Sequence, residues 1–197
     1  MDNIGWRRLI YLVLILWIGL LLYSLFRIPA PALYLAVRAT ALFSYTAVFL
    51  AILSAEYLRE MRRLFGEPFL TVHHILAVAG LLLMSLHAVL FALLMRDITV
   101  FLPRFDSLRI FLSLGGRPAL YLFAIAALAA VVRGRIRHIW RTIHWLNYLA
   151  FALAFVHSWL IGTDVSNLLL RSIWVVLAGI VLWVFIRKRL LQRRTRH

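Results

Sequence analysis

Four histidines form two pairs of nearly equal spacing within apolar stretches of the sequence. His73 and His87 are 14 residues apart, and His144 and His157 are 13 apart. At about 1.5 Å of rise per helical residue, either spacing separates two imidazoles by roughly 20 Å along a helix axis. Imidazole is a common axial ligand of porphyrin iron, and two imidazoles on facing helices hold the iron from both sides. Two helices with two histidines each therefore predict two stacked haems and an electron path across a membrane.

The helical phase of the histidines indicates which of them share a face. At about 100° per residue, 14 steps return to within about 40° of the starting direction, whereas 13 steps miss it by about 140°. We therefore expect His73 to be the ligand that pairs with His87, and His74 to be a neighbouring group in the cofactor site. His144 and His157 fail this test on a regular helix. Their helix is expected either to contain a π-bulge or a bend, or to meet the two haems on opposite flanks.

Each ligating imidazole needs an acceptor for its second ring nitrogen, because that hydrogen bond orients the ring. Backbone carbonyls are candidates, and so are the hydroxyls of Thr71, Ser85 and Ser158. Arg38 lies inside an apolar stretch, where it is expected either to pair with a haem propionate or to extend to the membrane interface. A single metal ion held by several side chains is disfavoured, because ligands about 20 Å apart cannot meet at one ion.

The composition places the chain in a membrane. Hydrophobic residues make up 64% of it and charged residues 15%, and its mean hydropathy is +0.94. A membrane span needs about 20 mostly apolar residues. Six stretches qualify with varying quality: Leu9 to Phe26, Leu33 to Leu53, Phe69 to Met95, Pro118 to Val132, which is short, Ile143 to Ile161, and Leu168 to Ile186. We predict an all-α integral membrane protein, a single domain over residues 1–197 with six transmembrane helices and with haems between the third and fifth.

The basic residues predict the orientation, because Lys and Arg accumulate on the cytoplasmic flanks of membrane helices. With the N-terminus inside, 15 of the 22 basic residues fall on the cytoplasmic side. Both termini are therefore predicted to be cytoplasmic, in a multi-pass protein of the cytoplasmic membrane. The net charge of +15 then reflects topology and attraction to anionic headgroups. Nucleic acid is not an expected partner, because no basic domain lies outside the membrane.

Two further features bear on partners and cofactors. The chain has no cysteine, which excludes disulfides, cysteine-ligated clusters and covalently attached c-type haem. Residues 96–117 mix apolar and charged side chains around Pro103 and are expected to lie in the outer interface. This segment could roof the outer half of the bundle, dock a partner, or simply cover apolar surface.

The residues around the histidines resemble a known family. The blocks VHHILAVAGLLLMSLHAVL (72–90) and WRTIHWLNYLAFALAFVHSW (140–159) are similar to the ferric-reductase-like transmembrane domain, which includes NADPH oxidases, ferric reductases and the bacterial MsrQ family. The element formed by Trp140, His144 and Tyr148 belongs to this pattern, and the family shares the spacing of thirteen. The resemblance implies an inner haem b held by His73 and His144 and an outer haem b held by His87 and His157.

The length of the chain indicates which members of this family it resembles in size. The oxidases and eukaryotic ferric reductases carry a cytoplasmic FAD and NADPH domain, whereas this sequence has eleven residues after Ile186. We therefore expect an electron-transfer subunit of an oxidoreductase system, MsrQ-like in size, that takes electrons from quinol or a separate flavoprotein. Its acceptor would be an outer-face reductase, ferric iron or oxygen. The MsrQ family usually lacks a histidine at the position of His73, so the sequence favours two haems over the methionine sulfoxide role. An FMN site, also suggested for that family, has no motif here.

Two other classes of function fit the same residues. One is a non-redox scaffold, which would be colourless. The other is a proton channel with histidines as relay groups, because imidazole titrates near neutral pH. It would conduct protons without pigment.

Overall fold

The computed structural model describes residues 3–66 and 69–194, which form helices and loops without any strand. The elements in chain order are α1 (Asn3–Arg27), α2 (Ala32–Glu56), α3 (Leu58–Phe65), α4 (Phe69–Met95), η1 (Ile98–Phe101), α5 (Leu108–Ser113), α6 (Gly116–Val131), α7 (Trp140–His144), α8 (Leu146–Ile161), η2 (Asp164–Ser166) and α9 (Leu168–Arg194).

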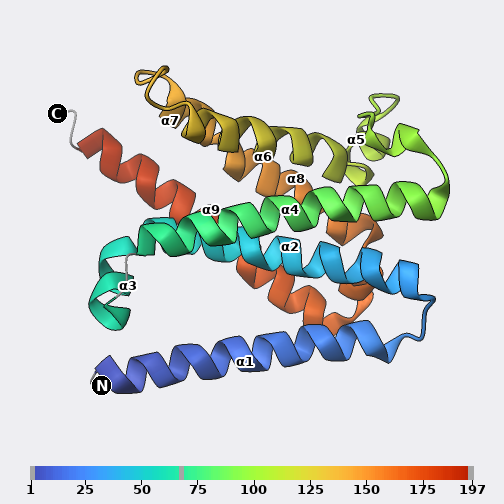
Figure 1. Ribbon diagram of the computed structural model, residues 1–197, viewed down its shortest axis with the longest axis horizontal. Coiled ribbons are helices and arrows are strands. Elements are labelled where there is room, and N and C mark those ends of the chain that lie inside the picture. The colour runs from blue at the N-terminus through green and yellow to red at the C-terminus, as the bar shows by residue number, and fades with distance from the viewer. Residues whose placement is uncertain (1–2, 67–68, 195–197) are drawn as a thin grey trace.

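The long helices run side by side and share two common ends (Figure 1). The start of α1, the short helix α3 and the end of α9 lie at one end, called here the terminal end. The segments η1, α5 and η2 lie at the other, called here the η2 end. The basic residues at the start of α1, in α3, between α6 and α7, and at the end of α9 therefore gather at the terminal end.

Four of the described helices are long and apolar enough to cross a membrane: Ile4–Arg27, Ala32–Glu56, Leu70–Met95 and Leu168–Lys188. They correspond to four of the six predicted spans. The other two stretches form α6 and α8, of 16 residues each. Because a span needs about 20 residues, these two helices fall short on their own. The architecture is thus an all-helical bundle with membrane-length helices, in which the predicted count of six spans is not confirmed.

The stretch predicted to be the fifth span is interrupted at Trp145, directly after His144. The Trp145 N–H lies 3.2 Å from the carbonyl oxygens of both Arg141 and Thr142, and the Tyr148 N–H bonds to the Trp145 carbonyl. The bonds from Trp145 to Thr142 and from Tyr148 to Trp145 span three residues and tighten the turn, which divides α7 from α8. A turn of three-residue periodicity advances by about 120° per residue, so it reduces the phase mismatch between His144 and His157 by about 60°. The irregularity is therefore a tightened turn and not a π-bulge.

Helices α2 and α4 form a closely packed antiparallel hairpin, and Gly80 marks their close approach. A Cβ atom at Gly80 would lie 2.8 Å from Val48 Cγ2 and 3.3 Å from the Val48 backbone nitrogen. Gly80 lies midway between His73 and His87 in the sequence, so this contact holds α4 against α2 between the two histidines.

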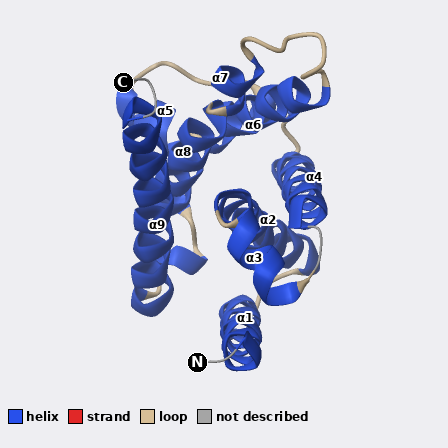
Figure 2. Cartoon of the chain, turned by 90° about the vertical axis from the view of Figure 1, so that its left-hand side faces the viewer, coloured by secondary structure: helices blue, strands red, loops and turns tan. Residues whose placement is uncertain are grey.

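Helices α5 to α9 form a second group that faces the α2–α4 hairpin, whereas α1 and α3 lie beside α2 (Figure 2). Helices α6 and α8 pack against each other, and α9 lies next to α8. The two groups meet at a buried aromatic cluster. Tyr45 of α2 stacks on Trp174 of α9, with ring centroids 4.4 Å apart, and lies 4.7 Å from Phe151 of α8. Helix α1 contacts this cluster through Trp17, whose indole nitrogen donates to Thr46 Oγ1.

We predict that Gly80→Leu destabilises the protein by about 1–3 kcal/mol, because its side chain would overpack the interface between α2 and α4. Thermal unfolding in detergent, followed by circular dichroism, measures this change. Gly19→Leu is the matched control, since no atom lies within 4 Å of a Cβ at Gly19. Equal melting temperatures for the two variants would contradict the close contact at Gly80.

Candidate functional site

Each of the four paired histidines is bound to the backbone of a neighbouring helix through the same ring atom. The Nδ1 atoms of His73 and His87, on α4, lie 2.8 Å from Ala51 O and 2.9 Å from Val37 O of α2. His144 Nδ1 lies 3.1 Å from Ala126 O of α6, and His157 Nδ1 lies 2.7 Å from Ser113 O of α5. Of the acceptors suggested by the sequence, the backbone carbonyls fill this role. Ser85 and Ser158 instead donate to carbonyls of their own helices.

These contacts determine the protonation of the rings. A carbonyl oxygen only accepts hydrogen bonds, so each Nδ1 must carry the proton and donate it. In a neutral imidazole, Nε2 is then an unprotonated acceptor whose lone pair can bind a metal. With Nδ1 as the donor, all four imidazoles present Nε2 for ligation, with their orientation fixed by the backbone. At His144 the side-chain amide nitrogen of Asn147 also lies 3.3 Å from Nδ1 and 3.4 Å from Nε2.

The acceptor carbonyls repeat the spacing of the histidines. Val37 and Ala51 are 14 residues apart, like His73 and His87. Ser113 and Ala126 are 13 apart, like His144 and His157. The two intervals match because the helices are antiparallel: a given number of residues along one helix corresponds to the same number in the opposite direction along the other. Two hairpins of different construction therefore each place two anchored imidazoles, one towards the terminal end and one towards the η2 end.

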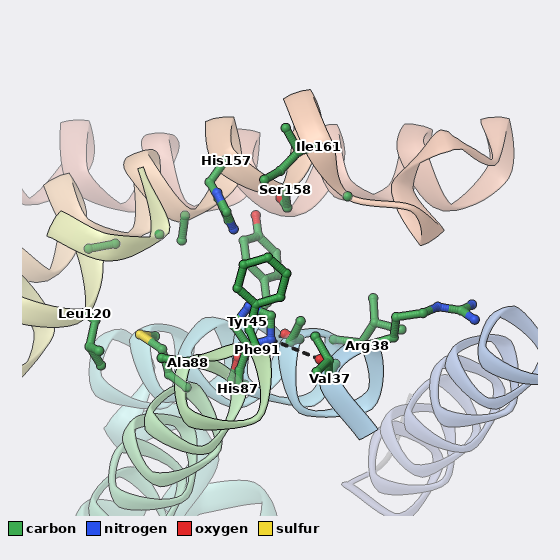
Figure 3. A pocket seen from close by; sticks show the side chains of 18 of the residues that line it. Val37, Arg38, Tyr45, His87, Ala88, Phe91, Leu120, His157, Ser158 and Ile161 are labelled. Atoms are coloured by element: carbon green, nitrogen blue, oxygen red, sulfur yellow. Dashed lines mark hydrogen bonds between the residues drawn. The ribbon is translucent and has the colours of Figure 1, made fainter. Parts of the chain in front are cut away.

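His87 and His157 both line a cavity of about 260 Å³ between the two groups of helices. They approach it from opposite walls, α4 on one side and α8 on the other, with Tyr45 and Phe91 drawn between them (Figure 3). A Cβ at Gly116 would lie 3.0 Å from His157 Cδ2 and Nε2, so the absence of a side chain there makes room for the ring. Most of the remaining lining is apolar.

Two arginines line the same cavity towards the η2 end. Arg38 is buried, and its Nε and Nη2 donate to Asp164 Oδ2 and Oδ1 at 2.9 and 2.6 Å. It also donates to the carbonyls of Ser24 and Ile28. The sequence suggested a propionate partner or an interfacial position for Arg38, but it gave no sign of this pairing with Asp164. Arg117 donates to the carbonyls of Thr99 and Leu102 and so holds the η1 segment beside the cavity.

The other histidine pair lies towards the terminal end. His73 lies near the start of α4, and His144 is the last residue of α7. Beside them Lys188 Nζ lies 2.9 Å from Glu56 Oε2, which joins the end of α2 to α9. His74 is exposed on α4, with its ring centroid 5.6 Å from that of His73. His74 therefore lies next to the pair without sharing its backbone anchor.

No group of three or more His, Cys, Asp or Glu side chains that could hold a metal ion occurs among the residues that the structure describes. A porphyrin iron needs only two protein ligands, one above and one below the ring. Sequence reasoning missed Asp164, Gly116 and Tyr45. Of these, only the Gly115-Gly116 pair carries a visible signal, since adjacent glycines mark a close approach or a turn.

Comparisons with protein-family models, with curated proteins and with solved structures found no significant match to this chain.

We predict that Asp164→Asn destabilises the protein by about 3–5 kcal/mol, because it leaves the Arg38 guanidinium buried without its counter-charge. Thermal unfolding in detergent tests this. Asp106→Asn is the control: Asp106 also pairs with an arginine, Arg104, at 2.9 Å, but both side chains are about half exposed, so little change is expected. A small effect at both positions would mean that the buried pair contributes no more than a surface pair.

Proposed function

We propose that the chain is a membrane subunit that binds b-type haem, two per chain, and passes electrons across the cytoplasmic membrane to an acceptor on its outer face. The observation that carries the proposal is the set of four imidazoles, each with Nδ1 anchored on a backbone carbonyl and Nε2 left as a potential ligand. They come from facing helix hairpins and lie at two levels, separated by roughly 20 Å.

The cavity at His87 and His157 supports a haem as the occupant. Its walls are mostly apolar, its two imidazoles come from opposite sides, and Arg117 lies at one edge, where it could meet a propionate; Arg38 at the same edge is already held by Asp164. The hydroxyl of Tyr45 is the one buried side-chain polar atom without a hydrogen-bond partner among the described residues. Buried polar atoms are rarely left unpaired, so an unpaired one beside a cavity favours a missing ligand.

The cavity is small for a macrocycle, so a side chain in it would have to move on binding. About 260 Å³ is slightly below the range of about 300–1,000 Å³ that is typical of ligand pockets. The ring of Phe91 is stacked on His87, with centroids 6.4 Å apart. We expect Phe91 to rotate away from the imidazole when a macrocycle binds, because this side chain occupies the space next to the ligating ring.

The protein's own residues would do three things in this function. The haem iron supplies one-electron redox chemistry when bound. The anchored imidazoles would ligate the iron through Nε2, the apolar walls would exclude water, and the hairpins would fix the distance between the two levels. The gathering of basic segments at the terminal end supports a cytoplasmic location for that end. Electrons would then enter there from quinol or a flavoprotein and leave at the η2 end.

Haem quantification with reduced-minus-oxidised spectra of the purified protein tests the proposal. The wild type should contain two b haems per chain. Replacing either His87 or His157 by Leu should remove one haem, and replacing either His73 or His144 should remove the other, since each loses one axial ligand.

His74→Leu serves as the matched control for His73→Leu, because it removes a neighbouring imidazole that has no backbone anchor. It should retain both haems. A colourless wild-type protein would refute the proposal and favour the scaffold or the proton channel, and loss of pigment in His74→Leu would refute the assignment of ligands.

A further inference from the structure

A second, open concavity adjoins the cavity at the η2 end. It has a volume of about 570 Å³ and is lined by Trp159, Leu160, Ile161, Gly162, Thr163, Val165, Ser166 and Arg171. Four of these residues, Ile161, Gly162, Thr163 and Val165, also line the cavity between His87 and His157. The wall between the two spaces is therefore a single stretch of chain that links α8 to η2.

Arg171 is the only charged residue in the lining of this concavity. Its guanidinium carbon lies 3.9 Å from the centroid of the Trp159 ring. Arg38 and Arg104 have carboxylate partners, whereas no carboxylate lies within ion-pair distance of Arg171 in the described part of the chain. A guanidinium stacked on an aromatic ring keeps its N–H groups in its own plane, where they can bind carboxylate or phosphate oxygens.

The neighbouring charges favour an anion at this position. The acid next to the concavity, Asp164, is already neutralised by Arg38. Arg27, Arg96 and Arg109 also lie in segments at the η2 end, together with Asp97, which caps η1, and Asp106, which pairs with Arg104. A concave surface with one sign of charge raises the local concentration of the opposite sign.

We propose that Trp159 and Arg171 form a binding site for a small anionic electron acceptor that carries carboxylate or phosphate oxygens. This inference rests on the proposed function, because the site gains its role from the adjoining cavity. Only the segment that links α8 to η2 would separate the acceptor from the space between His87 and His157. It would receive one electron there without a proton, and the reduced protein would lose that electron.

Binding can be measured separately from electron transfer. The complex of gallium(III) with EDTA is anionic, carries carboxylate oxygens and accepts no electron. Isothermal titration of this complex into detergent-solubilised protein, with or without haem, should show binding that Arg171→Gln weakens about tenfold or more, the loss expected for a hydrogen bond between charged groups. Trp159→Leu keeps the charge but removes the stacking partner, so it should weaken binding to a smaller extent.

The same variants can be tested in dithionite-reduced protein with two acceptors of opposite charge. Arg171→Gln should raise the KM for iron(III)–EDTA about tenfold. It should leave the KM for the hexaammineruthenium(III) cation unchanged or lower. Arg109→Gln is the control, because it removes the same charge from an exposed position at the same end. It should affect both acceptors little.

The outcomes separate this inference from the proposed function. Absence of haem with gallium–EDTA binding that depends on Arg171 would refute the function and leave the anion site standing. If the protein binds two haems and Arg171→Gln and Arg109→Gln change the KM for iron(III)–EDTA equally, the anion site alone is refuted. Native mass spectrometry distinguishes a lipid as the source of the anion. A phospholipid retained by the wild type and lost in Arg171→Gln, with an unchanged KM for iron(III)–EDTA, would overturn the acceptor assignment.

Discussion

The hydrogen bond from an imidazole Nδ1 to a carbonyl of the neighbouring helix is the interaction on which the candidate site depends. It occurs four times, and in both hairpins the interval between the acceptors equals the interval between the histidines. Because the carbonyls belong to the backbone, no side-chain substitution at the acceptor positions removes them directly. The position of each ring is therefore set by how two helices pack, and the packing contact at Gly80 becomes part of the site.

The distance between the two halves of the site depends on a different set of contacts. The α2–α4 hairpin meets the second group of helices through the stacked rings of Tyr45 and Trp174, near the middle of α2. Two ion pairs join α2 to the C-terminal part of the chain, Arg38 with Asp164 at one end and Glu56 with Lys188 at the other. A buried pair is costly to break from one side, because the remaining charge has no water around it. These contacts hold the hairpins at a spacing that leaves room between His87 and His157.

The sequence predicted the helical class and the paired histidines because both depend on local patterns, namely apolar runs and spacing along one chain. It also anticipated an irregularity between His144 and His157, since 13 residues cannot return to one face of a regular helix. It could not predict that Trp145 is the point of interruption or that Asp164 is the partner of Arg38. Those features depend on which helices become neighbours, and Arg38 and Asp164 are 126 residues apart. The shortness of α8 was likewise hidden, because apolar residues continue before its first residue, Leu146, whereas α6 has nearly the bounds of the short apolar stretch Pro118 to Val132.

The anchoring of Nδ1 also bears on the choice between a metal ligand and a proton relay. A relay histidine takes up a proton on one ring nitrogen and releases one from the other, so both nitrogens must exchange protons in turn. Here release from Nδ1 would break its hydrogen bond and leave a carbonyl of an apolar helix interface without a donor, which is costly in the absence of water. A metal ligand has the opposite requirement, since it needs one nitrogen fixed as a donor so that the other points at the metal with a constant lone pair. The same bond that would impede a relay therefore suits axial ligation.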